Sequence, residues 1–211
     1  MEGKEHVWHR EVITAQVERA LRDLHQASIL ERCYLAGGTG LALHLGHRRS
    51  QDLDFFSRDP VDPDAIVPRI QTLNGFSLVS KGAGTLHATV QGTKVSFLGY
   101  DYPVLFPFEK FLEVNVADPR DITCMKISAI AGRGTRRDFV DLYAVSKQYG
   151  LRQQLEWFNQ KFAQANYSRV HVLKSLTYFE EAEKDPMPDM LVTLSWEEVK
   201  QFFLSEVPRL S

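Results

Sequence analysis

Residues 34–56, YLAGGTGLALHLGHRRSQDLDFF, decide the fold of this 211-residue chain. The apolar start of this stretch predicts a strand that runs into a glycine-rich turn. Apolar residues then continue to Gly46, so we expect a helix that has Thr39 as its N-cap and ends at this glycine. After a basic loop, residues 52–56 alternate between polar and apolar side chains, which is typical of a second strand.

The glycine-rich turn has two features that favour phosphate binding. Gly37 and Gly38 have no Cβ, so a ligand can approach the backbone closely, and Thr39 follows them directly. The N-terminus of the next helix presents free N–H groups and the positive end of its dipole. Many strand-to-helix turns contain glycine without binding anything, so the turn alone does not establish a function.

Two carboxylates follow on the expected second strand, just after Ser50. Since alternate residues of a strand share a face, Asp52 and Asp54 project side by side while Leu53 and Phe55 face the core. Such a pair can hold Mg²⁺, which takes its other ligands from water and substrate phosphates. An Asp-x-Asp pair is also common at a solvated strand end, but two like charges on one face favour a neutralising ion. The turn and the carboxylates together indicate nucleotide chemistry.

A second group of polar residues lies between residues 121 and 141. Lys126 is on a largely apolar helix, where it can neutralise phosphate charge or extend to solvent. Thr135 and Asp138 have the spacing of a capping box, and Asp141 follows one helical turn later. Three arginines can grip a phosphate backbone or form a solvated face, and the spacing leaves both open: Arg133, Arg136 and Arg137.

Composition excludes several classes of protein. The net charge of −2 excludes nucleic-acid binding through bulk positive charge, and 44% hydrophobic residues allow a packed core. Cys33 and Cys124 are too few for a disulfide framework or a zinc site. His44 and His47 have a chelating spacing, but without a third ligand nearby we interpret them as packing or surface residues. The N-terminus has no signal-peptide pattern and no apolar run reaches ~18 residues, so we expect a soluble, cytoplasmic protein with no membrane contact.

The pattern along the chain predicts an α/β (α+β) fold with a helical C-terminal half. We divide it into an α/β core at residues 1–117 and a helical part at residues 118–211 that completes the active site and packs on the core. The core is expected to contain a helix at 11–26 and a short helix that follows the loop at 58–64 and ends at residue 73. Strands are expected at 76–80, 86–90, 94–100 and 112–116, with a hairpin turn at 91–93. Helices are expected at about 121–131, 136–149, 152–164, 169–183 and 196–205, the last after a capping box at Ser195 and Glu198.

The stretch at residues 34–56 resembles the AbiEii/AbiGii nucleotidyltransferase toxin family, which belongs to the DNA polymerase β-like nucleotidyltransferase superfamily. The run from Lys126 to Asp141, KISAIAGRGTRRDFVD, is similar to the second half of the same family. The likeness covers roughly residues 30–145. It implies a minimal nucleotidyltransferase fold, in which a mixed sheet flanked by helices presents the Gly-Gly-Thr turn and the Asp-x-Asp strand to an NTP.

The resemblance also implies roles for individual residues. The nucleotide-binding residues would be Gly37, Gly38, Thr39, Ser50 and Lys126. The catalytic residues would be Asp52 and Asp54 as Mg²⁺ ligands, Lys126, and Asp138 as a further acid or base, with Asp141 its competitor for that role. The implied reaction is attack of an acceptor hydroxyl on the α-phosphorus with loss of pyrophosphate. Members of the family act as toxins opposed by a cognate antitoxin, and some add nucleotides to tRNA 3′ ends.

One residue departs from the wider superfamily. Ser96 stands on the strand that usually supplies a third carboxylate. Two hypotheses therefore remain: a Mg²⁺-dependent nucleotidyltransferase toxin acting on tRNA or a protein hydroxyl, and a non-catalytic nucleotide-binding or partner-binding module. A metal-dependent nuclease or phosphohydrolase is a weaker third. An RNA acceptor would require five arginines to converge on one side of the cleft: Arg48, Arg49, Arg133, Arg136 and Arg137.

Overall fold

The N-terminal half of the chain forms the strands and the C-terminal half is helical. The N-terminal elements are η1 (Arg10–Val12), α1 (Ala15–Gln26), β1 (Tyr34–Leu35), α2 (Gly37–Leu45), β2 (Leu53–Ser57), α3 (Pro63–Ile70), β3 (Ser77–Gly82), β4 (Thr85–Val90), β5 (Thr93–Gly99), β6 (Glu109–Phe111) and β7 (Val114–Val116). The C-terminal elements are α4 (Pro119–Arg133), α5 (Arg136–Lys161), α6 (Arg169–Ser175), α7 (Glu180–Glu183), α8 (Trp196–Glu206) and η2 (Val207–Leu210).

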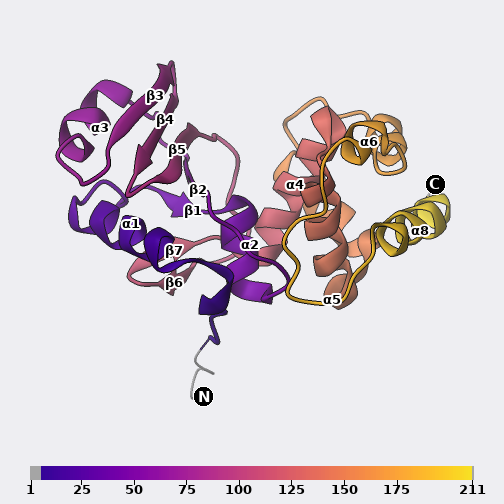
Figure 1. The fold of residues 1–211 in the computed structure, drawn as a ribbon. Helices are drawn as coiled ribbons and strands as arrows, with labels where there is room; N and C mark the ends of the chain where they lie inside the picture. The colour runs from indigo at the N-terminus through magenta and orange to yellow at the C-terminus, as the bar shows by residue number, and fades with distance from the viewer. Residues whose placement is uncertain (1–5, 211) are drawn as a thin grey trace, which may run out of the picture.

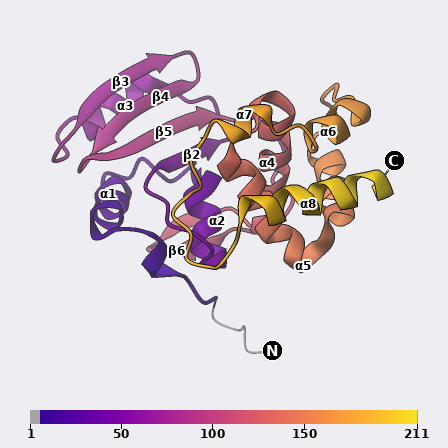
Figure 2. The ribbon, with the colours of Figure 1, turned by 45° about the vertical axis from the view of Figure 1, so that its right-hand side comes forward.

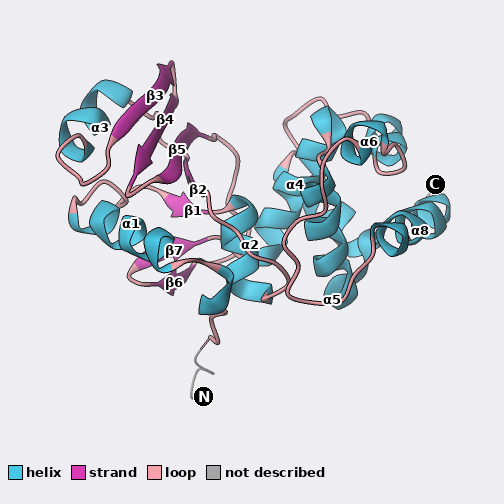
Figure 3. Cartoon of the chain, viewed as in Figure 1, coloured by secondary structure: helices cyan, strands magenta, loops and turns pink. Residues whose placement is uncertain are grey.

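This computed structural model describes residues 6–210, so residues 1–5, which form most of the N-terminal stretch considered for a signal peptide, lie outside it. The strands, α1 and α3 lie on one side of the molecule, the long helices α4 and α5 lie on the other, and α2 lies between them (Figure 1). Figure 3 shows the same division by secondary structure. The predicted α/β class with a helical C-terminal half is confirmed. Within residues 6–210, no helix is long and apolar enough to span a membrane.

The seven strands form one mixed sheet in the order β3-β4-β5-β2-β1-β7-β6. β2 is parallel to β5 and β1 is parallel to β7, whereas the other neighbours are antiparallel. Leu53 and Phe55 of β2 are fully buried in the core that the sheet forms with α1 and α3. The alternate residue, Asp54, lies on the opposite face, as the period of the strand predicts.

Most element predictions are confirmed, but the strand expected at 112–116 begins only at Val114. Leu112 and Glu113 have φ angles of 49° and 65° and form the turn of the β6–β7 hairpin. Neither residue is a glycine or asparagine, so the sequence gives no sign of this turn. In the β4–β5 hairpin, Gln91 and Gly92 have φ angles of 53° and 72°, which confirms the predicted turn.

The helical half agrees with its prediction over its longest element and differs after it. The two helices expected at 136–149 and 152–164 are confirmed: they lie end to end in α5 and are separated at Gly150, whose φ of 71° and ψ of 153° are not helical. The helix expected at 169–183 is divided into α6 and α7. The capping box at Ser195 and Glu198 is confirmed at the start of α8.

The segment between α7 and α8 returns to the N-terminal half and passes beside α2 (Figure 2). Arg49 N donates to Asp189 O at 2.8 Å, and Leu191 N donates to His47 O at 3.0 Å. Buried apolar residues form one large cluster within residues 12–116 and another within 124–210, and a smaller cluster that includes Ala36 and Ile122 joins the halves. The domain boundary at residue 117 stays a prediction.

Candidate active site

The glycine turn at the start of α2 is packed directly against the aspartate strand. Ala36 N donates to Asp54 O at 3.0 Å, and Gly37 has a φ of +61°. A Cβ at Gly37 would lie only 2.9 Å from Asp54 Oδ2, and one at Gly38 would lie 2.3 Å from an Arg48 Nη2. Glycine is therefore required at Gly37 both by its backbone conformation and by the closeness of the carboxylate.

Thr39 does not cap α2, contrary to the sequence prediction. The N-cap is Ala36, and Thr39 is buried inside the first turn of the helix. Its hydroxyl donates to the Asp52 carbonyl oxygen and lies 2.7 Å from Ser50 Oγ. Thr39 thus joins the glycine turn to the start of β2, which positions the two aspartates.

Asp52 and Asp54 line the same cavity as the glycine turn. Burial raises the pKa of the Asp54 carboxyl, and the negative charge of Asp52 raises it further. The Ser96 hydroxyl, which pairs with Asp54 across the parallel β2–β5 ladder, hydrogen-bonds to the carboxylate and opposes this shift in pKa. Two carboxylates that repel each other in a partly buried site favour a cation between them.

The opposite wall of the cavity comes from the helical half. Lys126 on α4 is buried, and its Nζ lies 2.9 Å from Asp138 Oδ1 and 2.7 Å from Asp141 Oδ2. Asp138 Oδ2 accepts from Thr135 N and from its hydroxyl, at 3.1 and 2.7 Å. Asp138 therefore forms the predicted capping box and the ion pair with Lys126 at once.

Asp141 is fully buried beneath the cavity. Its carboxylate accepts from Arg48 Nε and Nη2 at 2.6 and 2.9 Å, and from His47 Nε2 at 2.8 Å. The charges of Lys126 and Arg48 and these hydrogen bonds hold the pKa of Asp141 well below its usual range, although burial opposes them. Asp141 has no contact with the cavity, so it positions the two cations. His47 is a supporting residue that the sequence analysis interpreted as a packing or surface residue, because its partner lies 94 positions away.

The cavity has a volume of about 230 Å³ and brings together most of the predicted site. Its lining residues are Gly37, Gly38, Arg48, Ser50, Asp52, Asp54, Lys126, Thr135, Arg137 and Asp138. One wall carries the carboxylates of Asp52 and Asp54, and the other carries Lys126, with Arg48 at its base. No group of three or more His, Cys, Asp or Glu side chains within residues 6–210 is placed to hold a metal ion. A cation bound here would take its further ligands from substrate and water.

The five arginines expected to contact an acceptor do not converge. Arg48 is 2% exposed and tied to Asp141, so it serves the cavity and not an acceptor surface, which corrects that prediction. Arg49 pairs with Asp189 at 3.0 Å, and Arg136 lies over the Trp196 ring. The two remaining arginines, Arg133 and Arg137, are exposed. Arg137 lines the cavity, with its Nη1 4.0 Å from Asp52 Oδ2, and Arg133 does not line it.

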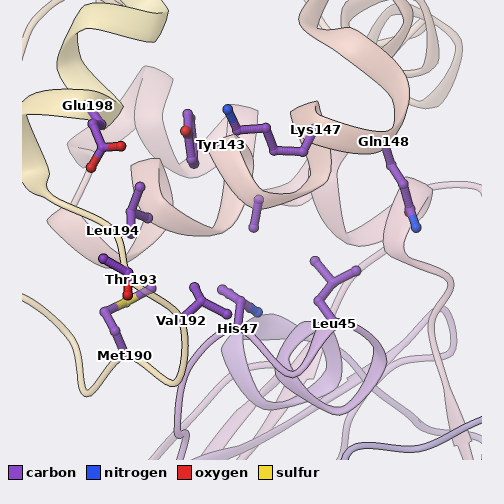
Figure 4. Close-up of a pocket in the computed structure, with 11 residues that line it drawn as sticks. Leu45, His47, Tyr143, Lys147, Gln148, Met190, Val192, Thr193, Leu194 and Glu198 are labelled. Atoms are coloured by element: carbon purple, nitrogen blue, oxygen red, sulfur yellow. The ribbon is translucent and has the colours of Figure 1, made fainter.

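A larger cavity, of about 360 Å³, lies at the C-terminal end of α2, where Leu45 and His47 line it (Figure 4). Tyr143 and Lys147 of α5 face Leu45, and Val192 and Leu194 of the returning segment close one side. None of the residues predicted to bind nucleotide or metal lines it. We place the chemistry in the smaller cavity because the carboxylates and the phosphate-binding turn meet there.

A mixed sheet that holds two carboxylates beside a helix N-terminus and opposite a buried lysine has the layout of a nucleotidyl-transfer site. Comparison with known proteins agrees. The family model described as nucleotidyl transferase AbiEii toxin, type IV toxin–antitoxin system, matches residues 19–210. The chain belongs to this family and is a nucleotidyltransferase. Membership implies an NTP substrate and an antitoxin partner.

Individual relatives support the same assignment. The chain is 36% identical over 194 residues to the protein aq_aa25 of Aquifex aeolicus (strain VF5), covering 89% of this chain and 92% of that one. Its fold is similar to JHP933 from Helicobacter pylori, with a TM-score of 0.56, 17% identity and coverage of 94% and 93% of the two chains. It is also similar to the nucleotidyltransferase toxin MenT4 from Mycobacterium tuberculosis H37Rv, with a TM-score of 0.54, 17% identity and coverage of 94% and 87%.

Proposed function

We propose that this protein transfers an NMP from an NTP to an acceptor hydroxyl, with Mg²⁺ bound by Asp52 and Asp54. The observation that carries the proposal is the cavity in which these carboxylates face Lys126 across the glycine turn. In a triphosphate with its metal ion, the positive metal would match the carboxylate wall and the negative phosphates would match the Lys126 wall. The helical half is proposed to complete the active site, since Lys126 comes from it.

The residues fit magnesium. Both ligands offer carboxylate oxygens, the donor atoms that Mg²⁺ prefers, and the absence of side chains at Gly37 and Gly38 leaves room for phosphate oxygens beside Asp54. When bound, the metal would neutralise charge that develops on the phosphates during transfer. The N–H groups of the α2 start would bind phosphate oxygens, and Ser50 would lie beside them.

Lys126 is proposed to neutralise the triphosphate from the helical side, with Arg48 supporting it from the base of the cavity. Asp141 and Asp138 hold the Lys126 ammonium in position. Asp138 as a catalytic acid or base stays a prediction, but its two oxygens are already engaged by Lys126 and Thr135. This arrangement favours a positioning role for Asp138.

The acceptor is the finer part of the proposal. A tRNA 3′ end remains the first acceptor to test, because Arg133 and Arg137 are exposed and Arg137 lies at the cavity. The dispersal of the other arginines leaves a protein hydroxyl as the second. Either transfer would suit a toxin that an antitoxin opposes.

The experiment is transfer of α-labelled NTPs, each of the four in turn, to total tRNA and to cell protein in the presence of Mg²⁺. We expect label in the acceptor with the wild type and none with Asp52→Ala. Asp189→Ala, which changes an exposed carboxylate outside the cavity, is the matched control. Label that persists in Asp52→Ala would contradict the assigned metal site.

A non-catalytic nucleotide-binding module is the second candidate, favoured by Ser96 in place of a third carboxylate. It predicts saturable NTP binding without pyrophosphate release in the presence of either acceptor. Release of pyrophosphate in step with labelling would exclude it.

A further inference from the structure

Three strands place a chain of polar side chains on the sheet face that carries Asp54. Ser96 on β5 is paired with Asp54 on β2 and with His87 on β4. His87 Nδ1 lies 3.1 Å from Ser96 Oγ, and the Ser96 hydroxyl bonds to the Asp54 carboxylate. All three side chains are half-buried and share one face of the sheet; Asp54 lines the cavity, and Ser96 and His87 continue the polar row from it across β5 and β4.

The direction of these hydrogen bonds follows from the chemistry of the groups. An ionised carboxylate only accepts, so the Ser96 hydroxyl must donate its one proton to Asp54. Ser96 Oγ can then only accept from His87, so His87 Nδ1 carries a proton. In the neutral ring this leaves a lone pair on Nε2. The array therefore carries a basic nitrogen two strands away from the carboxylate proposed to bind the metal.

We propose that His87 is the general base of the transfer reaction, acting from this array in place of a third carboxylate. This inference rests on the proposed function. The acceptor oxygen forms a bond to the α-phosphorus, the bond from that phosphorus to the bridging oxygen breaks, and pyrophosphate leaves with its electron pair. The proton of the acceptor hydroxyl passes to His87 Nε2. The resulting imidazolium is stabilised by the negative charge of Asp54, relayed through Ser96.

Two features of the site support this role. Asp138, the acid or base that the family resemblance implies, is occupied by Lys126 and Thr135, whereas the outer nitrogen of His87 has no hydrogen-bond partner among residues 6–210. The sheet face is also on the side of the cavity opposite Lys126, which would hold the triphosphate. An acceptor that approaches over β4 and β5 would meet His87 before it reaches the phosphorus.

The test compares two substitutions of one residue. His87→Asn keeps an N–H donor near Ser96 but has no basic nitrogen, whereas His87→Ala removes both. For a general base we expect both variants to lose about 100- to 10,000-fold in kcat, with NTP affinity unchanged within twofold. Added imidazole should restore transfer by His87→Ala. Thr89→Ala, two residues along the same face of β4, is the control and should retain wild-type rates.

A second readout does not depend on activity. The ¹⁵N spectrum of the His87 ring should show the tautomer with a protonated Nδ1 in the wild type, and Ser96→Ala should release this preference. A His87→Asn variant within threefold of wild-type kcat would overturn the proposal, as would a ring without the tautomer preference. Both results leave the nucleotidyltransferase itself intact. A wild type that transfers nothing would instead remove the proposed function together with this inference.

Discussion

The Lys126 ammonium and the Asp141 carboxylate lie 2.7 Å apart, and both are buried. Asp141 also binds Arg48, so one carboxylate holds two cations beneath the proposed phosphate site. Two buried positive charges without a counterion would repel each other, and a phosphate-binding wall of this kind therefore depends on an acid that never meets the substrate.

Asp141→Asn should destabilise the protein by about 3–5 kcal/mol, because it leaves buried cations uncompensated. Since the pKa of Asp141 is lowered in the folded state, its contribution to stability is present above the unfolded pKa of about 4 and is lost as pH falls through the folded value. Urea unfolding measures the change. Asp189→Asn removes an exposed pair with Arg49 and should change stability by less than about 1 kcal/mol; an equal loss in both variants would contradict the assignment.

Gly37→Ala should lose about 1–2 kcal/mol of stability from the positive φ alone, and its Cβ should displace Asp54. We expect weaker binding of Mg²⁺ and NTP together, measured by calorimetry. Gly132→Ala is the matched control, because that glycine is helical and exposed and nothing lies within 4 Å of its added Cβ. It should be neutral or stabilising by up to about 1 kcal/mol. Unchanged binding in Gly37→Ala would show that the turn does not touch the ligand.

Asp54→Asn should raise the melting temperature in EDTA at pH 7. The raised pKa of Asp54 means that its ionised form opposes folding: its stabilising contribution is present below the unfolded pKa and is lost as pH rises through the folded value. Addition of Mg²⁺ should stabilise the wild type and leave the variant unchanged. Asp64→Asn, an exposed carboxylate, should follow the wild type in both conditions. A lower melting temperature for Asp54→Asn would indicate that this carboxylate is structural.

His44 should make folding sensitive to mild acid. Burial lowers its pKa to about 4, and its Nε2 lies 2.9 Å from Ala117 O. The folded state therefore holds a neutral imidazole, and its contribution to stability is lost as pH falls from about 6.5 to about 4, by roughly 3 kcal/mol. In His44→Gln this part of the pH dependence should disappear from urea unfolding curves. A curve with the same slope as that of the wild type would assign the acid sensitivity to other groups.

Local patterns were sufficient for the fold class and for much of the site. The period of β2 correctly put Asp54 on the face opposite Phe55, and the spacing of Thr135 and Asp138 predicted a real capping box. These features depend on neighbours within a few residues. The sequence therefore carries them directly.

Features that depend on distant partners were not predictable. The pairing of Asp141 with His47 spans 94 positions, and the contact of His87 with Ser96 depends on the register of a hairpin. Thr39 was expected at a cap because its residue type favours caps, but a strand-to-helix turn through Gly37 begins the helix earlier. The dispersal of the arginines likewise reflects tertiary partners such as Asp189 and Trp196.

The return of residues 189–191 to residues 47–49 also affects when the enzyme becomes complete during synthesis. Arg49 and Asp189 are 140 positions apart, so the loop that carries Arg48 stays uncovered until the ribosome has passed residue 189. Lys126 and Asp141 likewise emerge long after the aspartate strand. A nascent chain that has passed β2 but not yet α5 therefore carries the two aspartates without the cationic wall of the cavity. This member of a toxin family thus becomes active only after α5 and residues 189–191 have been made.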